Sequence, residues 1–251
     1  MTQDVPVTIP TLERHISLEI AFNVRHLGGY EAAQGRRTRD RLVRSASLHR
    51  LTPESVHQIV AAGVSTIVDL RSTAEVERDV TPDMSSESVR NVHAPVFQSD
   101  AAPSAMGDNF PGFGTVYERF LEQGGPAYRT LAESVLESDG VVLFHCAAGK
   151  DRTGVAAMLL LDLSGVGERD IVADYAESEY HLESERPVWM ERMSERGMSP
   201  ELSAKLLGSH PEAMEITLDV LRHRWGSAAG YFRAQGMSGH QIERLQERLV
   251  D

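Results

Sequence analysis

Three short apolar runs along the chain predict buried β-strands. They lie at residues 64–70, 89–97 and 140–145 and are rich in Val, Leu and Phe. Runs of this length, especially with β-branched residues, are typical of strands covered on both faces of a sheet. The pattern therefore predicts a sheet whose central strands are buried.

Apolar residues at helical spacing separate and follow these runs. The sequence TPESVHQIV at residues 52–60 supplies an N-cap, a Pro at the first helical position and an early acid. This predicts a helix that ends near Gly63. Further helices are expected over 116–122, 128–137 and 154–163, and from Glu168 onward the pattern is almost wholly helical.

The alternation of strands and helices predicts an α/β fold in one domain that spans residues 1–251. We expect a mainly parallel central sheet flanked by helices, with a largely helical C-terminal third. Residues 98–114 are rich in Gly, Pro and small side chains and predict a long exposed loop, which in a compact domain is more often functional than idle. Open α/β sheets bind ligands at the carboxyl ends of their strands, so we expect the site there.

Composition and charge narrow the function classes. Hydrophobic residues make up 41% of the chain and the formal net charge is −12, so a folded protein without a broad nucleic-acid-binding face is expected. No run is long enough for a transmembrane helix, and the N-terminus lacks the pattern of a signal peptide. The default expectation is a cytoplasmic protein, although non-classical export would leave no mark in the sequence. The histidines show no metal-ligand spacing, and no metal or other cofactor is expected.

The single cysteine lies between the third apolar run and the following helix, in the sequence HCAAGKDRTG at residues 145–154. A loop that enters a helix N-terminus turns several backbone N–H groups toward one point, where they bind an anion such as phosphate. Small side chains let the backbone approach the ligand, and a guanidinium clamps two phosphate oxygens. The residues expected to bind phosphate are Ala147, Ala148, Gly149, Lys150, Asp151 and Arg152.

The same loop predicts a reactive thiolate at Cys146, since amide dipoles and nearby cations favour the ionised sulfur. A cysteine after a buried strand is by itself usually a small core residue, and only its spacing to Arg, Thr and Gly favours a nucleophile. Thr153 is expected to donate a hydrogen bond to the sulfur and help it to leave in a second step. His145 is expected to orient the loop rather than act as a base.

The spacing His-Cys-x-x-Gly-x-x-Arg-Thr-Gly resembles the Cys-dependent protein tyrosine phosphatases. The fuller form HCxxGKDRTG is similar to the bacterial tyrosine/serine protein phosphatase family typified by protein tyrosine phosphatase B. The segments FNVRHLGGY, RLVRSASL, VDLRS and DIVADY agree in order, so the resemblance runs from about Phe22 to the C-terminal helices. It implies a one-domain phosphatase fold, a phosphocysteine intermediate and a helical lid, whose nearest equivalent here is residues 179–207.

The leaving group of such a reaction needs a proton, and two aspartates compete to supply it. Asp100 lies in the long loop, where this enzyme class commonly keeps a mobile acid, but the loop lacks a Trp-Pro-Asp triplet. Asp151 lies in the phosphate loop itself, where it would alternatively orient water or balance charge. Asp108 is a third candidate.

Other charged residues are expected near the same edge of the sheet. Asp69 and Arg71 end the first predicted strand, where they form a structural ion pair or support the substrate and the loop. Glu75 and Arg78 follow on the next helical turn and belong to the same surface. Arg25 is a candidate to brace the site, although the glycines after it predict a turn.

These observations predict a metal-independent phosphatase that acts on phosphotyrosine in a protein or peptide. The resemblance also admits phosphoserine, phosphothreonine and phosphoinositides, and a Lys in the loop suits a multiply charged lipid headgroup. A phosphate-binding pseudoenzyme is disfavoured because nucleophile, Arg152 and Thr153 are all present. Sulfur transfer of the rhodanese type is disfavoured by the Arg-Thr-Gly sequence and the five-residue gap.

Overall fold

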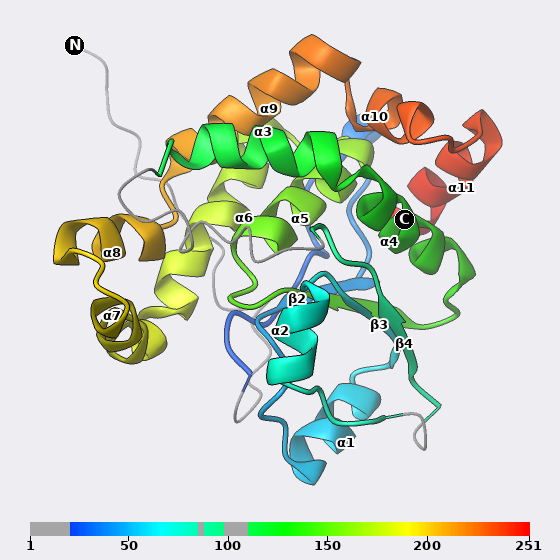
Figure 1. Ribbon diagram of the computed structural model, residues 1–251. Helices are drawn as coiled ribbons and strands as arrows, with labels where there is room; N and C mark the ends of the chain where they lie inside the picture. Colours follow the sequence, from blue (N-terminus) through cyan, green and yellow to red (C-terminus); the bar gives the residue numbers. More distant parts are fainter. Residues whose placement is uncertain (1–20, 85–87, 98–109) are drawn as a thin grey trace.

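A five-stranded sheet forms the centre of the computed structural model, which describes residues 21–84, 88–97 and 110–251 (Figure 1). In spatial order the strands are β1 (Arg25–His26), β2 (Leu42–Ser45), β5 (Val141–His145), β3 (Val64–Asp69) and β4 (Arg90–His93). β1 is antiparallel to β2, and every other pair is parallel. The predicted α/β fold with a mainly parallel sheet is confirmed.

Helices cover both faces of the sheet. They are α1 (Pro53–Ala61), α2 (Thr73–Arg78), α3 (Phe113–Gln123), α4 (Gly125–Glu137), α5 (Asp151–Leu163), α6 (Glu168–His181), α7 (Arg186–Glu195), α8 (Pro200–Leu207), α9 (Pro211–Trp225), α10 (Ala228–Ala234) and α11 (Gly239–Leu249). Short 3-10 turns lie at Ala33–Gly35 and Glu183–Glu185. The C-terminal third is largely helical, as predicted.

Side chains that alternate along the central strands build two cores. Val68 and Phe144 face the larger core, which includes α3 to α6 and the C-terminal helices, whereas Ile67 and Leu143 face a smaller core against α1. Figure 1 shows α1 on one side of the sheet and α3, α5 and α6 on the other. Burial on both faces explains why β3 and β5 are apolar throughout.

The register of the two central strands places their carboxyl ends side by side. Asp69, the last residue of β3, pairs with His145, the last residue of β5. The first predicted strand is therefore right to within one residue. The predicted strand at 89–97 shortens to β4, although the N–H groups of Ala94 and Val96 still bond to the end of β3 and to the residue after it.

Two further elements differ from the sequence prediction. β2 was not expected, because Arg44 and Ser45 interrupt its apolar pattern, yet both side chains are buried. α5 begins at Asp151, three residues earlier than the predicted helix, so the phosphate loop leads directly into its first turn. In the part of the chain that the structure describes, no helix has both the length and the apolar character that a membrane crossing requires.

Candidate active site

A cleft of about 540 Å³ opens where β3 and β5 end, and Cys146 lies in it. The residues of the loop after β5 line one wall, α2 a second and α7 and α8 a third. Cys146 follows directly after β5 and is only 2% exposed. Its sulfur therefore lies at the bottom of the cleft, and a ligand must enter the cleft to reach it.

The loop closes tightly because Gly149 adopts a positive φ of 67°. A methyl group at this position would overlap the backbone of Ser45, so only glycine fits. The carbonyl of Ala147 accepts a hydrogen bond from the N–H of Ser47 (2.9 Å). Asn23 Nδ2 donates to the carbonyl of Ala148 (3.1 Å).

These carbonyl contacts leave the loop amides for a ligand. Arg44 Nη2 donates to the carbonyl of Gly149 (2.7 Å), so three consecutive loop carbonyls are held by the surrounding protein. Within the described ranges, the N–H groups of residues 147–150 donate no hydrogen bond. A ring of unpaired amides at a helix N-terminus attracts a tetrahedral anion.

Two fully buried arginines hold this loop from behind. Arg44 forms an ion pair with Asp174, and Arg25 Nε bonds to the same carboxylate at 3.0 Å. Burial, with the charge of Arg44 beside it, lowers the pKa of Arg25 to about 10 despite the nearby carboxylates. Arg25 therefore braces the loop indirectly, through the shared Asp174.

Arg152 is fixed by a bidentate ion pair with Glu75. Its Nη1 and Nη2 atoms lie 2.6 and 2.7 Å from the two carboxylate oxygens. Glu75 also accepts the N–H of Ser72 (2.8 Å) in the capping box of α2. Burial raises the pKa of Glu75, but the bonds and charge of Arg152 outweigh it and hold this pKa at about 2. The pair sets the plane of the guanidinium and leaves its other N–H groups for a ligand.

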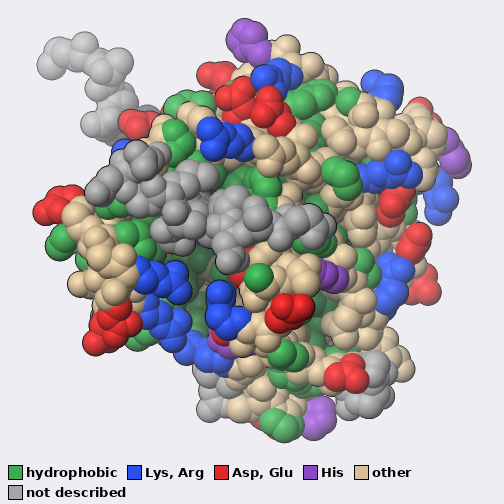
Figure 2. Space-filling model, in the orientation of Figure 1, with side chains coloured by type: hydrophobic (Ala, Val, Ile, Leu, Met, Phe, Trp, Pro, Cys, Tyr) green, Lys and Arg blue, Asp and Glu red, His purple; other side chains and the backbone are tan. Residues whose placement is uncertain are grey.

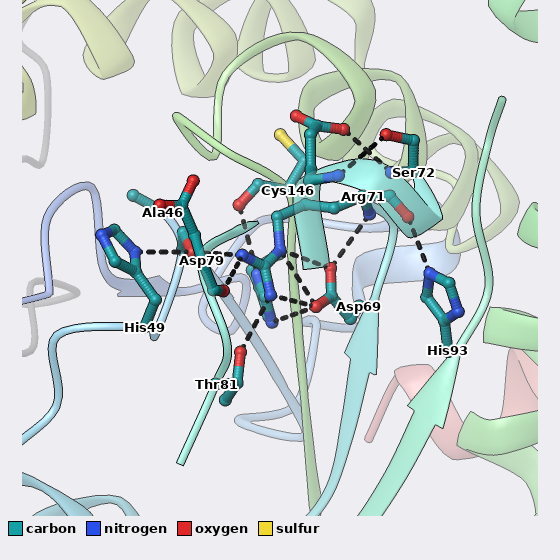
Figure 3. A network of polar contacts seen from close by, with 12 residues as sticks. Ala46, His49, Asp69, Arg71, Ser72, Asp79, Thr81, His93 and Cys146 are labelled. Atoms are coloured by element: carbon teal, nitrogen blue, oxygen red, sulfur yellow. Dashed lines mark hydrogen bonds and ion pairs between the residues drawn. The ribbon is translucent and has the colours of Figure 1, made fainter. Parts of the chain in front are cut away.

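Asp69 and Arg71 form a structural ion pair at the edge of the cleft (Figure 3). Arg71 Nη2 lies 2.6 Å from Asp69 Oδ2, and Arg71 Nε donates to the same carboxylate at 3.0 Å. The remaining guanidinium bonds go to Ser47 Oγ, the carbonyl of Asp79 and Thr81 Oγ1. All three guanidinium nitrogens of Arg71 thus donate to oxygen atoms of the protein, and these bonds connect the loop before α1 to the end of β3.

His145 lies beside this pair and beneath the loop. Its Nδ1 atom is 3.2 Å from the carbonyl oxygen of Cys146, and its Nε2 atom is 3.7 Å from Asp69 Oδ2. Burial lowers the pKa of His145, so the ring is neutral at neutral pH. This contact with the loop backbone is compatible with the orienting role expected from the sequence, which stays a prediction.

Asp151 lines the cleft in the first turn of α5, and two buried tyrosines fix its carboxylate. Tyr117 donates its hydroxyl proton to Asp151 Oδ1 at 2.5 Å, and its oxygen lies 2.8 Å from the hydroxyl of Tyr175. Burial raises the pKa of Tyr117 well above its usual value, so the hydroxyl remains a donor. Neither tyrosine was anticipated from the sequence.

Lys150 connects the loop to α8. Its Nζ atom donates to the carbonyls of Leu206 (2.7 Å) and Gly208 (2.8 Å) and lies 4.4 Å from the centre of the Phe113 ring. It therefore holds the C-terminal end of α8 in this structure. Residues 179–207, where the lid is expected, comprise the end of α6, α7 and α8, and the last two helices line the cleft.

The remaining predicted residues are placed as follows. Thr153 is buried in α5, and its hydroxyl oxygen has no partner among the described residues. Asp100 and Asp108 lie outside the described residues. In the described ranges, no group of three or more His, Cys, Asp or Glu side chains is arranged to hold a metal ion.

Sequence reasoning missed the supporting residues around the loop, which are Asn23, Arg44, Asp174, Tyr117 and Tyr175. Four of them, all except Tyr117, lie within the segments FNVRHLGGY, RLVRSASL and DIVADY that carry the family resemblance. Polar residues inside otherwise apolar elements, such as Arg44 in β2, were the available signal.

Comparison with known proteins places the chain among phosphatases. The sequence profile of the tyrosine phosphatase family matches residues 16–251. A tyrosine-protein phosphatase of Nostoc commune is 34% identical over 224 residues, covering 84% of this chain and 74% of the relative. The triple specificity protein phosphatase PtpB of Mycobacterium tuberculosis is 28% identical over 251 residues, covering 84% of this chain and 91% of the relative.

Among solved structures, that of P. aeruginosa TpbA aligns with 84% of this chain and 97% of its own, at 18% identity and a TM-score of 0.35. The family and the Nostoc commune relative bear the name of tyrosine phosphatases, which confirms the enzyme class predicted from the sequence, protein-tyrosine phosphatase. The chain belongs to the tyrosine phosphatase family.

Proposed function

We propose that this protein hydrolyses phosphotyrosine in proteins or peptides through a phosphocysteine intermediate on Cys146. The observation that carries the proposal is the loop itself. The buried sulfur of Cys146 precedes a run of loop amides that donate no hydrogen bond within the described residues, and Glu75 already orients the guanidinium of Arg152. Preorganised donors of this kind stabilise the charge on phosphoryl oxygens without reorganisation during the reaction.

In the first step the sulfur of Cys146 attacks phosphorus. The S–P bond forms as the bond from phosphorus to the phenolic oxygen breaks, and the leaving oxygen takes a proton from a general acid. The loop amides and Arg152 bind the non-reacting oxygens throughout. Lys150 is assigned to holding α8, because its ammonium already donates to two carbonyls there.

Asp151 is assigned as the general acid. It lines the cleft, and Tyr117 holds its Oδ1 atom, so Oδ2 is left to carry the proton toward the leaving group. Asp100 remains the competing candidate from the sequence, and the experiment below separates the two.

In the second step water attacks phosphorus and the S–P bond breaks. Asp151, now a carboxylate, takes a proton from the water, so that phosphate is released and the acid is restored. Thr153 lies on the first turn of α5, and its unpartnered hydroxyl is assigned to donate to the departing sulfur.

The depth of the sulfur favours phosphotyrosine over shorter side chains. Cys146 is 2% exposed at the bottom of the cleft, and a phosphorylated phenol reaches further from a peptide backbone than phosphoserine or phosphothreonine. Trp189 and Met193 of α7 line the same cleft and offer apolar surface to an aromatic ring.

An assay with aryl phosphates tests the proposal. Cys146→Ser should abolish turnover while the folded protein still binds a phosphate analogue, and retained turnover would remove Cys146 as the nucleophile. Asp151→Asn and Asp100→Asn should each be measured on substrates with good and poor leaving groups. In kcat/KM, which reports the first step, Asp151→Asn should lose most on the poor leaving group, because a good one departs without a proton. If that selective loss occurs in Asp100→Asn instead, Asp151 is not the acid.

A further inference from the structure

α7 presents two arginines to the cleft at some distance in sequence from the phosphate loop. Trp189, Arg192, Met193 and Arg196 line the cleft. Their spacing of three, one and three residues places them on one face of the helix and its C-terminal end. No residue of α7 is buried, although Met193 is half-buried and packs against the edge of the larger core.

These two arginines differ from the other cations of the cleft. The other Lys and Arg side chains that line it each have a carboxylate within 4.0 Å, in the pairs Arg50–Glu185, Arg71–Asp69, Arg78–Asp79, Lys150–Asp151 and Arg152–Glu75. Among the residues that the structure describes, Arg192 and Arg196 have no such partner. Two uncompensated charges therefore face a ligand site in a protein of net charge −12.

Between α7 and α2, Figure 2 shows Lys and Arg side chains gathered around the hollow. An acidic protein repels an acidic substrate over most of its surface, and a local basic patch selects where such a substrate docks. The patch on α7 lies beside the phosphate loop rather than in it, so it is placed to bind groups that flank the phosphorylated residue.

We propose that Arg192 and Arg196 form a subsite for acidic side chains next to the phosphotyrosine of a peptide substrate. The inference rests on the proposed phosphotyrosine hydrolysis and adds the class of sequence that this site prefers. In sequence, Met193 lies between the two arginines and Trp189 lies before them, and all four line the cleft. A peptide has apolar side chains that can pack against Trp189 and Met193. An inositol headgroup carries only hydroxyls and phosphates and would leave that apolar surface uncovered.

The subsite acts on substrate binding rather than on the chemical step. A flanking carboxylate carries the same charge before and during phosphoryl transfer, so its contacts lower KM and leave kcat nearly constant. An exposed ion pair changes affinity by roughly 1.4- to 5-fold, so two independent pairs together give roughly 2- to 25-fold. The preference should weaken as salt is added.

Two phosphotyrosine peptides test this subsite. They are identical except that one has Glu and Asp around the phosphotyrosine and the other has Gln and Asn. The test variant is Arg192→Gln with Arg196→Gln. The matched control is Arg233→Gln with Arg244→Gln, which makes the same change in net charge on α10 and α11, outside the cleft.

The quantity measured is the ratio of kcat/KM for the acidic peptide to that for the neutral peptide. The proposal predicts that this ratio falls roughly 2- to 25-fold in the test variant, through KM, and stays constant in the control. In the wild type the ratio should fall as NaCl is raised.

Three results overturn the subsite. In the first, the ratio of kcat/KM values is equal in wild type and test variant. In the second, this ratio falls equally in the test variant and in the control. In the third, phosphoinositide vesicles are assayed alongside the peptides, and the test variant loses activity only toward the vesicles. In the first two cases both peptides are still hydrolysed, so the proposed function stands without the subsite. If the wild type hydrolyses neither peptide, the proposed function fails and the subsite fails with it.

Discussion

The buried pair of Glu75 and Arg152 makes a quantitative prediction about stability. Glu75→Gln keeps the size of the side chain but removes the charge that pairs with Arg152. The pKa of Glu75 falls from its usual 4.5 to about 2 in the folded protein. Each pKa unit corresponds to about 1.4 kcal/mol, so ionised Glu75 stabilises the fold by about 3 kcal/mol at neutral pH relative to a neutral group.

The pH dependence follows from the direction of this shift. A depressed carboxyl pKa stabilises the folded state above the unfolded pKa, near 4.5, and this stabilisation is lost as the pH falls toward 2. The wild type should therefore exceed Glu75→Gln by about 3 kcal/mol at pH 7 and by about 2 kcal/mol at pH 3.5.

Urea unfolding followed by tryptophan fluorescence measures both values, since the chain contains two tryptophans. The control is Glu137→Gln, which breaks an exposed pair with Arg90 and should cost less than about 1 kcal/mol at any pH. The reasoning is refuted if Glu75→Gln costs no more than Glu137→Gln, or if its cost stays constant between pH 7 and 3.5.

Two further substitutions test the positioning of the site. Tyr117→Phe removes the donor to Asp151, so kcat/KM should fall roughly tenfold more on a poor leaving group than on a good one. The control Tyr231→Phe loses a buried bond to a backbone carbonyl and should show no such difference. Equal losses in both variants would contradict the role of Tyr117. Gly149→Ala should abolish aryl phosphate turnover and lower the free energy of unfolding well beyond Gly226→Ala, which changes only a positive-φ residue in open space and should cost about 1 kcal/mol. Equal costs at the two glycines in thermal unfolding would contradict the steric argument.

Local pattern was sufficient for the elements that are apolar on both faces. β3 and β5 appear as continuous apolar runs in the sequence because helices cover the sheet on either side. The phosphate loop after β5 was predicted from the spacing of residues within the loop. The five-residue gap between Cys146 and Arg152 is a local property, so the predicted phosphate loop needed no knowledge of the rest of the fold.

The support of the loop depends on contacts between distant residues, which no local pattern reveals. Arg44 is 130 residues from Asp174, and Arg152 is 77 residues from Glu75. A charged residue in a strand ordinarily argues against burial. β2 was missed for this reason, since its Arg44 is buried only because Asp174 and the loop carbonyls satisfy it.

The central claim is that the phosphoryl group is transferred to the sulfur of Cys146 before water releases it, and trapping this phosphocysteine intermediate tests the claim most directly. The Asp151→Asn variant should be mixed with an aryl phosphate that has a good leaving group, denatured rapidly with detergent at alkaline pH, where a P–S bond survives, and mapped by peptide mass spectrometry. The first step then needs no acid, whereas the second lacks its base, so the intermediate should accumulate. The account predicts a phosphoryl group on the peptide that contains Cys146, and none after Cys146→Ser. A phosphoryl group on any other residue, or turnover without a labelled Cys146, would contradict it.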